Sequence, residues 1–154
     1  MSTEDLFNST FFFTFAGMKH ICILFSAFVA IMAQAAEPWR LHLVNPDEGV
    51  NLRIDLYEES ITVPGMEMFG PMNGYLNGKG IYGVWTVTSF KIHDNHTSTL
   101  RLSNDLGSET QAIRLTCLND STYQMTLEDG VVMKKAVNRK LVKIAPQMTL
   151  RLKQ

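Results

Sequence analysis

A period-two alternation of apolar and polar residues recurs along residues 36–154, and no other feature constrains the fold as strongly. Such alternation is typical of strands that bury one face and expose the other to water. No sustained helical period interrupts it. The clearest runs place apolar side chains at every second position: Val50, Leu52, Ile54 and Leu56, then Tyr123, Met125 and Leu127, then Met148, Leu150 and Leu152. The pattern predicts an all-β fold, either a small antiparallel β-barrel or a barrel-like sandwich.

Turn-forming residues separate the predicted strands. They occur at residues 45–49, 104–107 and 119–121. Asp129-Gly130 is predicted to form a two-residue hairpin turn, because a type I′ turn requires positive φ angles. Residues 80–92 carry apolar side chains on both faces, which predicts a central strand or one covered on both sides.

A short motif lies inside this two-faced segment. Gly83-Val84-Trp85 resembles the Gly-x-Trp element that opens the first strand of lipocalins. The likeness covers only these residues, and strands are predicted before it as well as after it. Because the element comes so late in the chain, a complete lipocalin register does not fit, and no ligand is carried over from that family.

Residues 18–35 have the order of a secretory signal peptide. A polar start carries Lys19, an apolar run follows over residues 21–32, and an Ala-x-Ala motif ends at Ala35. We expect cleavage after Ala35 and export to the periplasm or the extracellular space. The working part of the chain is then a single all-β domain over residues 36–154.

Residues 1–17 do not fit a signal peptide, because they are acidic where the start of a signal is basic. We interpret them as a start-site extension, with Met18 as the first residue of the exported chain. The alternative joins residues 11–36 into one uncleaved anchor, which would place Lys19 inside the membrane, where charge is costly. The apolar run alone is also shorter than the roughly 20 residues that a membrane span needs. No stable membrane span is expected after cleavage.

Charge is unevenly distributed along the predicted domain. Removal of residues 1–35 leaves equal numbers of acidic and basic residues, which argues against a general nucleic-acid binder. Residues 131–154 nevertheless contain no acidic residue. Their basic residues are Lys134, Lys135, Arg139, Lys140, Lys143, Arg151 and Lys153. This end is interpreted either as a cationic surface for an anionic lipid, glycan or protein, or as strands that neutralise acidic partner strands.

The segment over residues 63–80 combines irregular and apolar character. Its glycines, prolines and asparagines predict a loop, yet it also carries large apolar side chains. One hypothesis is a lid or rim over the mouth of a barrel that binds a small apolar or amphipathic ligand. The alternative is a loop folded onto the core, with methionines as gap fillers. The predicted ligand-binding residues are Met66, Met68, Phe69, Met72, Tyr75, Tyr82 and Trp85.

The same methionines permit a second hypothesis, a periplasmic copper-binding protein. Thioethers are soft ligands that select Cu(I), and imidazole also binds copper. Met66, Met68 and Met72 with His93 or His96 supply these donor types. Residues 93–96 are also interpreted more simply as a polar hairpin loop, and no metal or other cofactor is assigned.

Catalytic motifs are missing from the sequence. It contains no G-x-S-x-G, H-E-x-x-H or phosphate-binding glycine loop. Asp55, Glu58 and Glu59 are close in sequence, but they follow an amphipathic strand and are interpreted as a solvated edge. His42 has no obvious nucleophile beside it. We expect a non-catalytic module that binds a small apolar ligand or a cell-envelope protein. The alternative is an interaction, inhibitor or immunity-type protein without a pocket.

Overall fold

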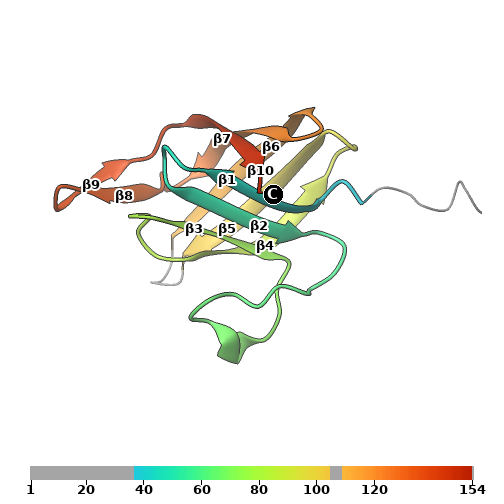
Figure 1. Ribbon diagram of the computed structural model, residues 1–154. Coiled ribbons are helices and arrows are strands. Elements are labelled where there is room, and N and C mark those ends of the chain that lie inside the picture. Colours follow the sequence, from blue (N-terminus) through green and yellow to red (C-terminus); the bar gives the residue numbers. More distant parts are fainter. Residues whose placement is uncertain (1–36, 105–108, 154) are drawn as a thin grey trace, which may run out of the picture. The chain divides into compact units, whose positions relative to one another are not determined.

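The computed structural model describes residues 37–104 and 109–153, within the compact unit Glu37–Gln154. The predicted signal peptide and the upstream extension lie outside the described residues. Eight antiparallel strands form a closed barrel (Figure 1). They are β1 (Arg40–Asn45), β2 (Val50–Asp55), β3 (Gly74–Gly78), β4 (Trp85–Ile92), β5 (Thr97–Asn104), β6 (Thr110–Asn119), β7 (Thr122–Gly130) and β10 (Gln147–Leu152). The all-β and barrel predictions are confirmed.

The barrel is an up-and-down meander with one interruption. Each strand from β1 to β7 pairs with the next along the chain, and β10 pairs with both β7 and β1 to close the cylinder. Between β7 and β10 the chain forms a separate two-stranded sheet, β8 (Lys134–Val137) and β9 (Lys140–Lys143). Long excursions therefore leave the barrel at both ends. We call the end that carries residues 56–73 the loop end, and the end that carries β8 and β9 the hairpin end.

The interior is built from the alternating side chains that the sequence pattern identified. In β2, Leu52 is fully buried and Arg53 is exposed, as the period-two pattern predicts. Every barrel strand contributes to the same apolar core. The largest fully buried side chains are Trp39, Trp85, Leu43, Leu52, Ile54, Leu76, Leu100, Leu102, Ile113, Leu115, Met125 and Met133.

The predicted hairpin turn at Asp129-Gly130 is wrong. Both residues belong to β7, where Gly130 pairs with Gln111 of β6 beside a β-bulge. A glycine is needed there for another reason. Its φ is +130°, and a Cβ atom would lie 2.3 Å from the carbonyl oxygen of Thr110. The tight turn occurs instead at Asn138-Arg139, where both φ angles are positive, at 51° and 63°.

The two-faced strand predicted over residues 80–92 is only partly correct. Strand β4 begins at Trp85, and its first three residues are buried. The remaining residues of β4 are all exposed, because β3 pairs only with Trp85 and Thr86. The Gly-x-Trp element thus opens the fourth strand of this barrel and not the first.

The part of the chain that the structure describes contains no helix of the length and apolar character needed to cross a membrane.

Candidate functional site

Apolar side chains close both ends of the barrel. At the loop end, Trp39 is fully buried and packs edge-to-face against Tyr123, with the two ring centroids 6.3 Å apart. Its indole N–H donates a hydrogen bond to the carbonyl oxygen of Asp94 at 3.1 Å. Burial, followed by the neighbouring Cys117, raises the pKa of Tyr123 to about 12. At the hairpin end, buried Ile81 and Met133 join the core. Side chains therefore occupy the place where a barrel-type carrier holds its ligand.

Trp85 belongs to this packed core. Its side chain is 1% exposed, and its indole N–H donates to the carbonyl oxygen of Tyr82 at 3.2 Å. The amide of Asn104 donates to the same oxygen at 3.4 Å. Tyr82 itself is exposed and lies in the β3–β4 connection, at the hairpin end. The backbone carbonyl of Tyr82 thus fixes the indole of Trp85, while the Tyr82 side chain lies on the surface.

The β2–β3 loop, residues 56–73, lies against the outer wall of the barrel. Leu76 points into the core, whereas its neighbour Tyr75 points outward into a second apolar cluster with Ile61 and Val63, which we call the outer-wall cluster. Met66, Met72 and Val84 pack on this cluster. A pair of backbone hydrogen bonds between Ile61 and Met72, at 3.0 and 2.9 Å, ties the two arms of the loop together.

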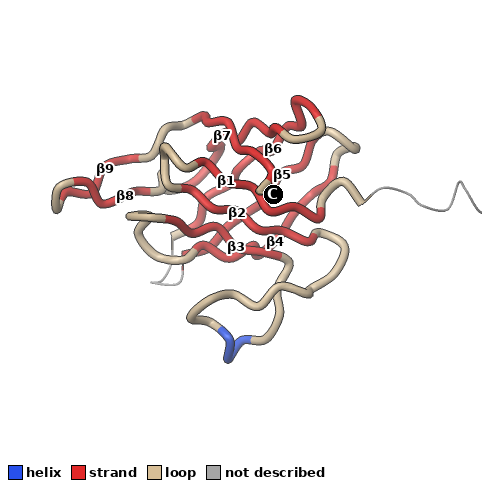
Figure 2. Tube along the Cα trace, in the orientation of Figure 1, coloured by secondary structure: helices blue, strands red, loops and turns tan. Residues whose placement is uncertain are grey.

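The tip of this loop is an ordered turn that exposes two large apolar side chains. The 3-10 helix η1 (Glu67–Phe69) lies there, shown in blue in Figure 2. Met68 is 88% exposed and Phe69 is 65% exposed. The carboxylate of Glu67 accepts a hydrogen bond from the backbone N–H of Gly65 at 2.9 Å, which lowers the pKa of Glu67.

The seven predicted ligand-binding residues therefore occupy separate places. Met66, Met72 and Tyr75 meet in the outer-wall cluster. Met68 and Phe69 lie on the exposed tip, Trp85 is in the barrel core, and Tyr82 is on the surface at the hairpin end. The chain pattern identified apolar residues correctly, but the face of the barrel to which the loop returns depends on long-range packing.

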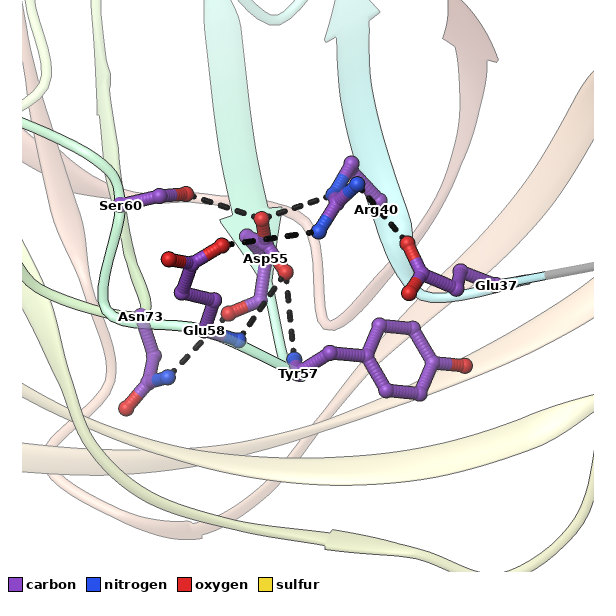
Figure 3. A network of polar contacts seen from close by, with 7 residues as sticks. All are labelled: Glu37, Arg40, Asp55, Tyr57, Glu58, Ser60 and Asn73. Atoms are coloured by element: carbon purple, nitrogen blue, oxygen red, sulfur yellow. Dashed lines mark hydrogen bonds and ion pairs between the residues drawn. The ribbon is translucent and has the colours of Figure 1, made fainter.

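Asp55 is the centre of a polar network at the loop end (Figure 3). Its buried carboxylate accepts hydrogen bonds from Arg40 Nε and Ser60 Oγ, both at 2.8 Å, and from the backbone N–H groups of Tyr57 and Glu58, both at 3.2 Å. Burial raises the pKa of Asp55, but the hydrogen bonds from Ser60, Arg40 and Tyr57 outweigh it, so the net pKa is lowered. Asn73 donates to the backbone carbonyl of Asp55 at 3.2 Å. The network closes the start of the β2–β3 loop onto β1 and β2.

The predicted solvated edge is correct for Glu58 and Glu59, which are exposed, but wrong for Asp55, which is buried. Arg40 forms ion pairs with Glu37 at 2.8 Å and with Glu58 at 4.0 Å, while Glu59 is exposed. A carboxylate with a lowered pKa and four donors is ionised and saturated at neutral pH, which does not suit a general acid. His42 is also held structurally, because its Nε2 lies 2.5 Å from Asn51 Oδ1 on the outer wall.

The side chains proposed as copper ligands are dispersed over the structure. Met66 and Met72 are half-buried in the outer-wall cluster, whereas Met68 is exposed on the tip. His93 Nε2 contacts the hydroxyl of Thr99 at 3.0 Å. Within residues 37–104 and 109–153, no group of three His, Cys, Asp or Glu side chains is placed to hold one metal ion.

Two hollows on the outer wall were not expected from the sequence. One has a volume of about 680 Å³ and lies along β1 and β10, with Asn45, Ser121, Thr149 and Arg151 in its lining. The other, of about 240 Å³, lies along β1 and β2 beside Asp55. The polar side chains in both linings come from outward-facing positions, which a period-two pattern places on the wall without showing where the wall is concave.

The chain was also compared with known proteins. No protein-family model, curated protein or solved structure matches it.

Proposed function

We propose that the domain is a non-catalytic binding module that binds a cell-envelope protein on its outer surface, at the tip of the β2–β3 loop. One observation carries the proposal: Met68 and Phe69 are 88% and 65% exposed on a turn that internal hydrogen bonds hold in shape. Methionine and phenylalanine are enriched in the buried centres of protein interfaces. A preorganised turn also loses little conformational entropy when it binds.

The packing of the barrel supports a surface site over an internal one. A carrier of small apolar molecules needs an empty interior, whereas here the core strands contribute large side chains with no solvent exposure. The saturated hydrogen bonding of Asp55 supports a non-catalytic role, because this buried carboxylate is committed to holding the loop.

Site-specific photo-crosslinking tests the protein partner. A photo-reactive phenylalanine analogue at position 69 is expected to give one discrete adduct with an envelope protein in intact cells. The matched control places the same analogue at Leu118, which is 52% exposed in β6. Equal adduct patterns at the two positions, or no adduct at position 69, would overturn the proposal.

A small apolar ligand is the second candidate, because the β2–β3 loop, with glycines at 65 and 70, surrounds the outer-wall cluster of Ile61, Val63 and Tyr75. A ligand there would displace Met66 or Met72, whose thioether chains adapt readily to new neighbours. Titration with N-phenyl-1-naphthylamine tests it. Saturable fluorescence that Met72→Ser reduces, while Leu118→Ser leaves it unchanged, would favour the ligand over the protein partner.

A further inference from the structure

Strands β8 and β9 with their turn, residues 134–143, form an arm outside the barrel, which we call the basic hairpin. Figure 1 shows it projecting from the barrel wall between β7 and β10. Every residue of β9 is exposed. The hairpin is a two-stranded sheet with no third strand described beside it, apart from one bridge between Ile81 and Lys135.

The basic hairpin carries unneutralised positive charge. Half of its ten residues are lysine or arginine, and none is acidic. Lys135 pairs with Glu48 at 2.5 Å. Among the described residues, the other bases of the hairpin form no ion pair: Lys134, Arg139, Lys140 and Lys143. One of the two interpretations of this basic end is neutralisation by acidic partner strands. Here only Lys135 is neutralised, and its partner Glu48 lies in the β1–β2 turn.

Exposed apolar side chains are interleaved with these cations. Val137, Leu141 and Val142 are 41%, 52% and 46% exposed. Directly opposed residues of an antiparallel pair share a face. The register opposes Val137 to Lys140 and Lys135 to Val142, so these four lie on one face. The other face carries Ala136 opposite Leu141, with Lys134 opposite Lys143. Each face thus combines aliphatic side chains with lysines.

The base of the hairpin is anchored. Met133 is fully buried just before β8, Ile144 is 3% exposed just after β9, and a backbone hydrogen bond of 3.0 Å joins them. The β3–β4 connection holds β8 through Tyr82 N–H to the Lys134 carbonyl, at 3.0 Å, and through Ala136 N–H to the Gly80 carbonyl, at 2.7 Å. The arm therefore presents its tip in a fixed direction.

The tip places a cation at a position that usually takes glycine. Asn138 and Arg139 have φ angles of 51° and 63°, as in a type I′ turn, for which Asn-Gly is the favoured pair. Arginine at the second position is conformationally unfavourable, and Lys140 follows it directly. The tip of the hairpin thus carries two adjacent positive charges.

We propose that the basic hairpin docks the domain onto an anionic lipid surface. The hairpin enters the surface tip first, so that aliphatic side chains of both faces, Val137, Leu141 and Val142, reach the boundary between head groups and acyl chains. The lysines keep their stems along this apolar layer and place their ammonium groups at lipid phosphates. A nucleic acid or a glycan would bind the cations and leave the aliphatic side chains in water, so the interleaving favours lipid. The inference is independent of the loop-tip partner, because the hairpin lies at the other end of the barrel.

Flotation with phospholipid vesicles tests the proposal. The full chain is compared with Arg139→Gln/Lys140→Gln on vesicles of phosphatidylcholine alone and with about 30 mol% phosphatidylglycerol, an anionic content that produces a negative surface potential. Loss of the two tip charges is expected to weaken partition to the anionic vesicles by at least about tenfold. The control, Lys91→Gln/Arg101→Gln, removes the same charge from exposed positions of β4 and β5 and is expected to change partition by less than about twofold. All variants keep residues 1–36, so any membrane affinity of that segment is common to them.

A second pair of variants separates lipid from a soluble polyanion. Leu141→Ser and Leu118→Ser each remove a leucine that is 52% exposed. Lipid docking requires that only Leu141→Ser weakens vesicle binding. Equal binding by the parent and the tip-charge variant would overturn the proposal, as would an equal loss in the Lys91→Gln/Arg101→Gln control. Charge-dependent binding that heparin abolishes and that Leu141→Ser does not alter would assign the hairpin to a soluble polyanion and overturn the lipid assignment. None of these outcomes affects the crosslink at position 69.

Discussion

Two excursions leave the same meander and behave in opposite ways. The β2–β3 loop folds back onto the outer wall of the barrel and builds its own small core around Tyr75. The basic hairpin forms a regular two-stranded sheet and stays in solvent. Regular secondary structure is therefore not what decides whether an excursion packs, because the irregular segment packs and the regular one projects.

Side-chain chemistry accounts for the difference. The loop has Ile61, Val63, Met66 and Met72 at positions where they bury apolar surface against Tyr75. The hairpin has lysines next to every aliphatic side chain on both faces, so it cannot bury either face without desolvating charge. One excursion stabilises the barrel, and the other is available for a charged partner.

Truncation of one apolar side chain in each excursion tests this comparison most directly. Tyr75→Ala removes the centre of the outer-wall cluster and is expected to lower the free energy of unfolding by about 3 kcal/mol. Leu141→Ala is expected to change it by less than about 0.5 kcal/mol, because the side chain is exposed. Urea unfolding followed by circular dichroism measures both values. Equal losses would show that the hairpin packs as firmly as the loop.

Gly130 marks the point at which β7 leaves the barrel toward the hairpin. Gly130→Ala would place a Cβ atom 2.3 Å from the Thr110 carbonyl oxygen at a φ of +130°, so β7 must separate from β6. We expect a loss of about 2 kcal/mol in the free energy of unfolding. Hydrogen exchange at the start of β6, around Gln111, should accelerate while exchange in β1 and β2 stays unchanged. Retained protection in β6 would contradict the requirement for glycine.

The β2–β3 loop depends on an ionised carboxylate, which makes its attachment sensitive to acid. Asp55→Asn is expected to lower the free energy of unfolding by about 1.5 kcal/mol at pH 7, because the charge-assisted hydrogen bonds that Asp55 accepts from Ser60 and Arg40 are weakened. The pKa of Asp55 is lowered in the folded state, so its contribution is complete above the unfolded pKa of about 3.9 and is lost as the pH falls through the folded pKa. Urea unfolding at pH 7 and below pH 4 should therefore show the difference between parent and variant shrinking with acid. A pH-independent difference would assign the effect to shape alone.

The sequence predicts the barrel better than it predicts the excursions. Alternation in β2, β7 and β10 marks one buried face in each strand, and that face points into the core as expected. Period-two patterning is local information, since each strand carries its own. The turn over residues 46–49 was also predictable, because Gly49 supplies its positive φ of 68°.

The errors arise where local chemistry permits two structures. Asp129-Gly130 suits a tight turn, but the same glycine also permits β7 to pass close to Thr110, and that long-range pairing decides the outcome. The sequence identifies the methionines over residues 63–80 as apolar, yet nothing local indicates that Tyr75 points outward and packs against them. The number of basic residues at the C-terminal end can be read from the sequence. Their division between barrel strand β10 and the projecting hairpin depends on how the barrel closes, which the sequence does not indicate.

The smallest expected effect on the free energy of unfolding is a slight gain and not a loss, and the same substitution separates stability from membrane binding. Arg139→Gly places glycine at the second position of the Asn138-Arg139 turn, where φ is +63°. We expect the free energy of unfolding to stay unchanged or rise by about 0.5 kcal/mol, because removal of a strained side chain is partly offset by a more flexible unfolded chain. The same substitution removes a tip cation, so partition to anionic vesicles should fall severalfold while the fold is retained. Arg139→Lys, which keeps the charge and the strained φ, is the matched control and should bind like the parent. If Arg139→Gly binds vesicles as well as the parent does, the arginine has no role at the lipid surface; if it also unfolds more easily, the left-handed turn is not the strained element of the hairpin.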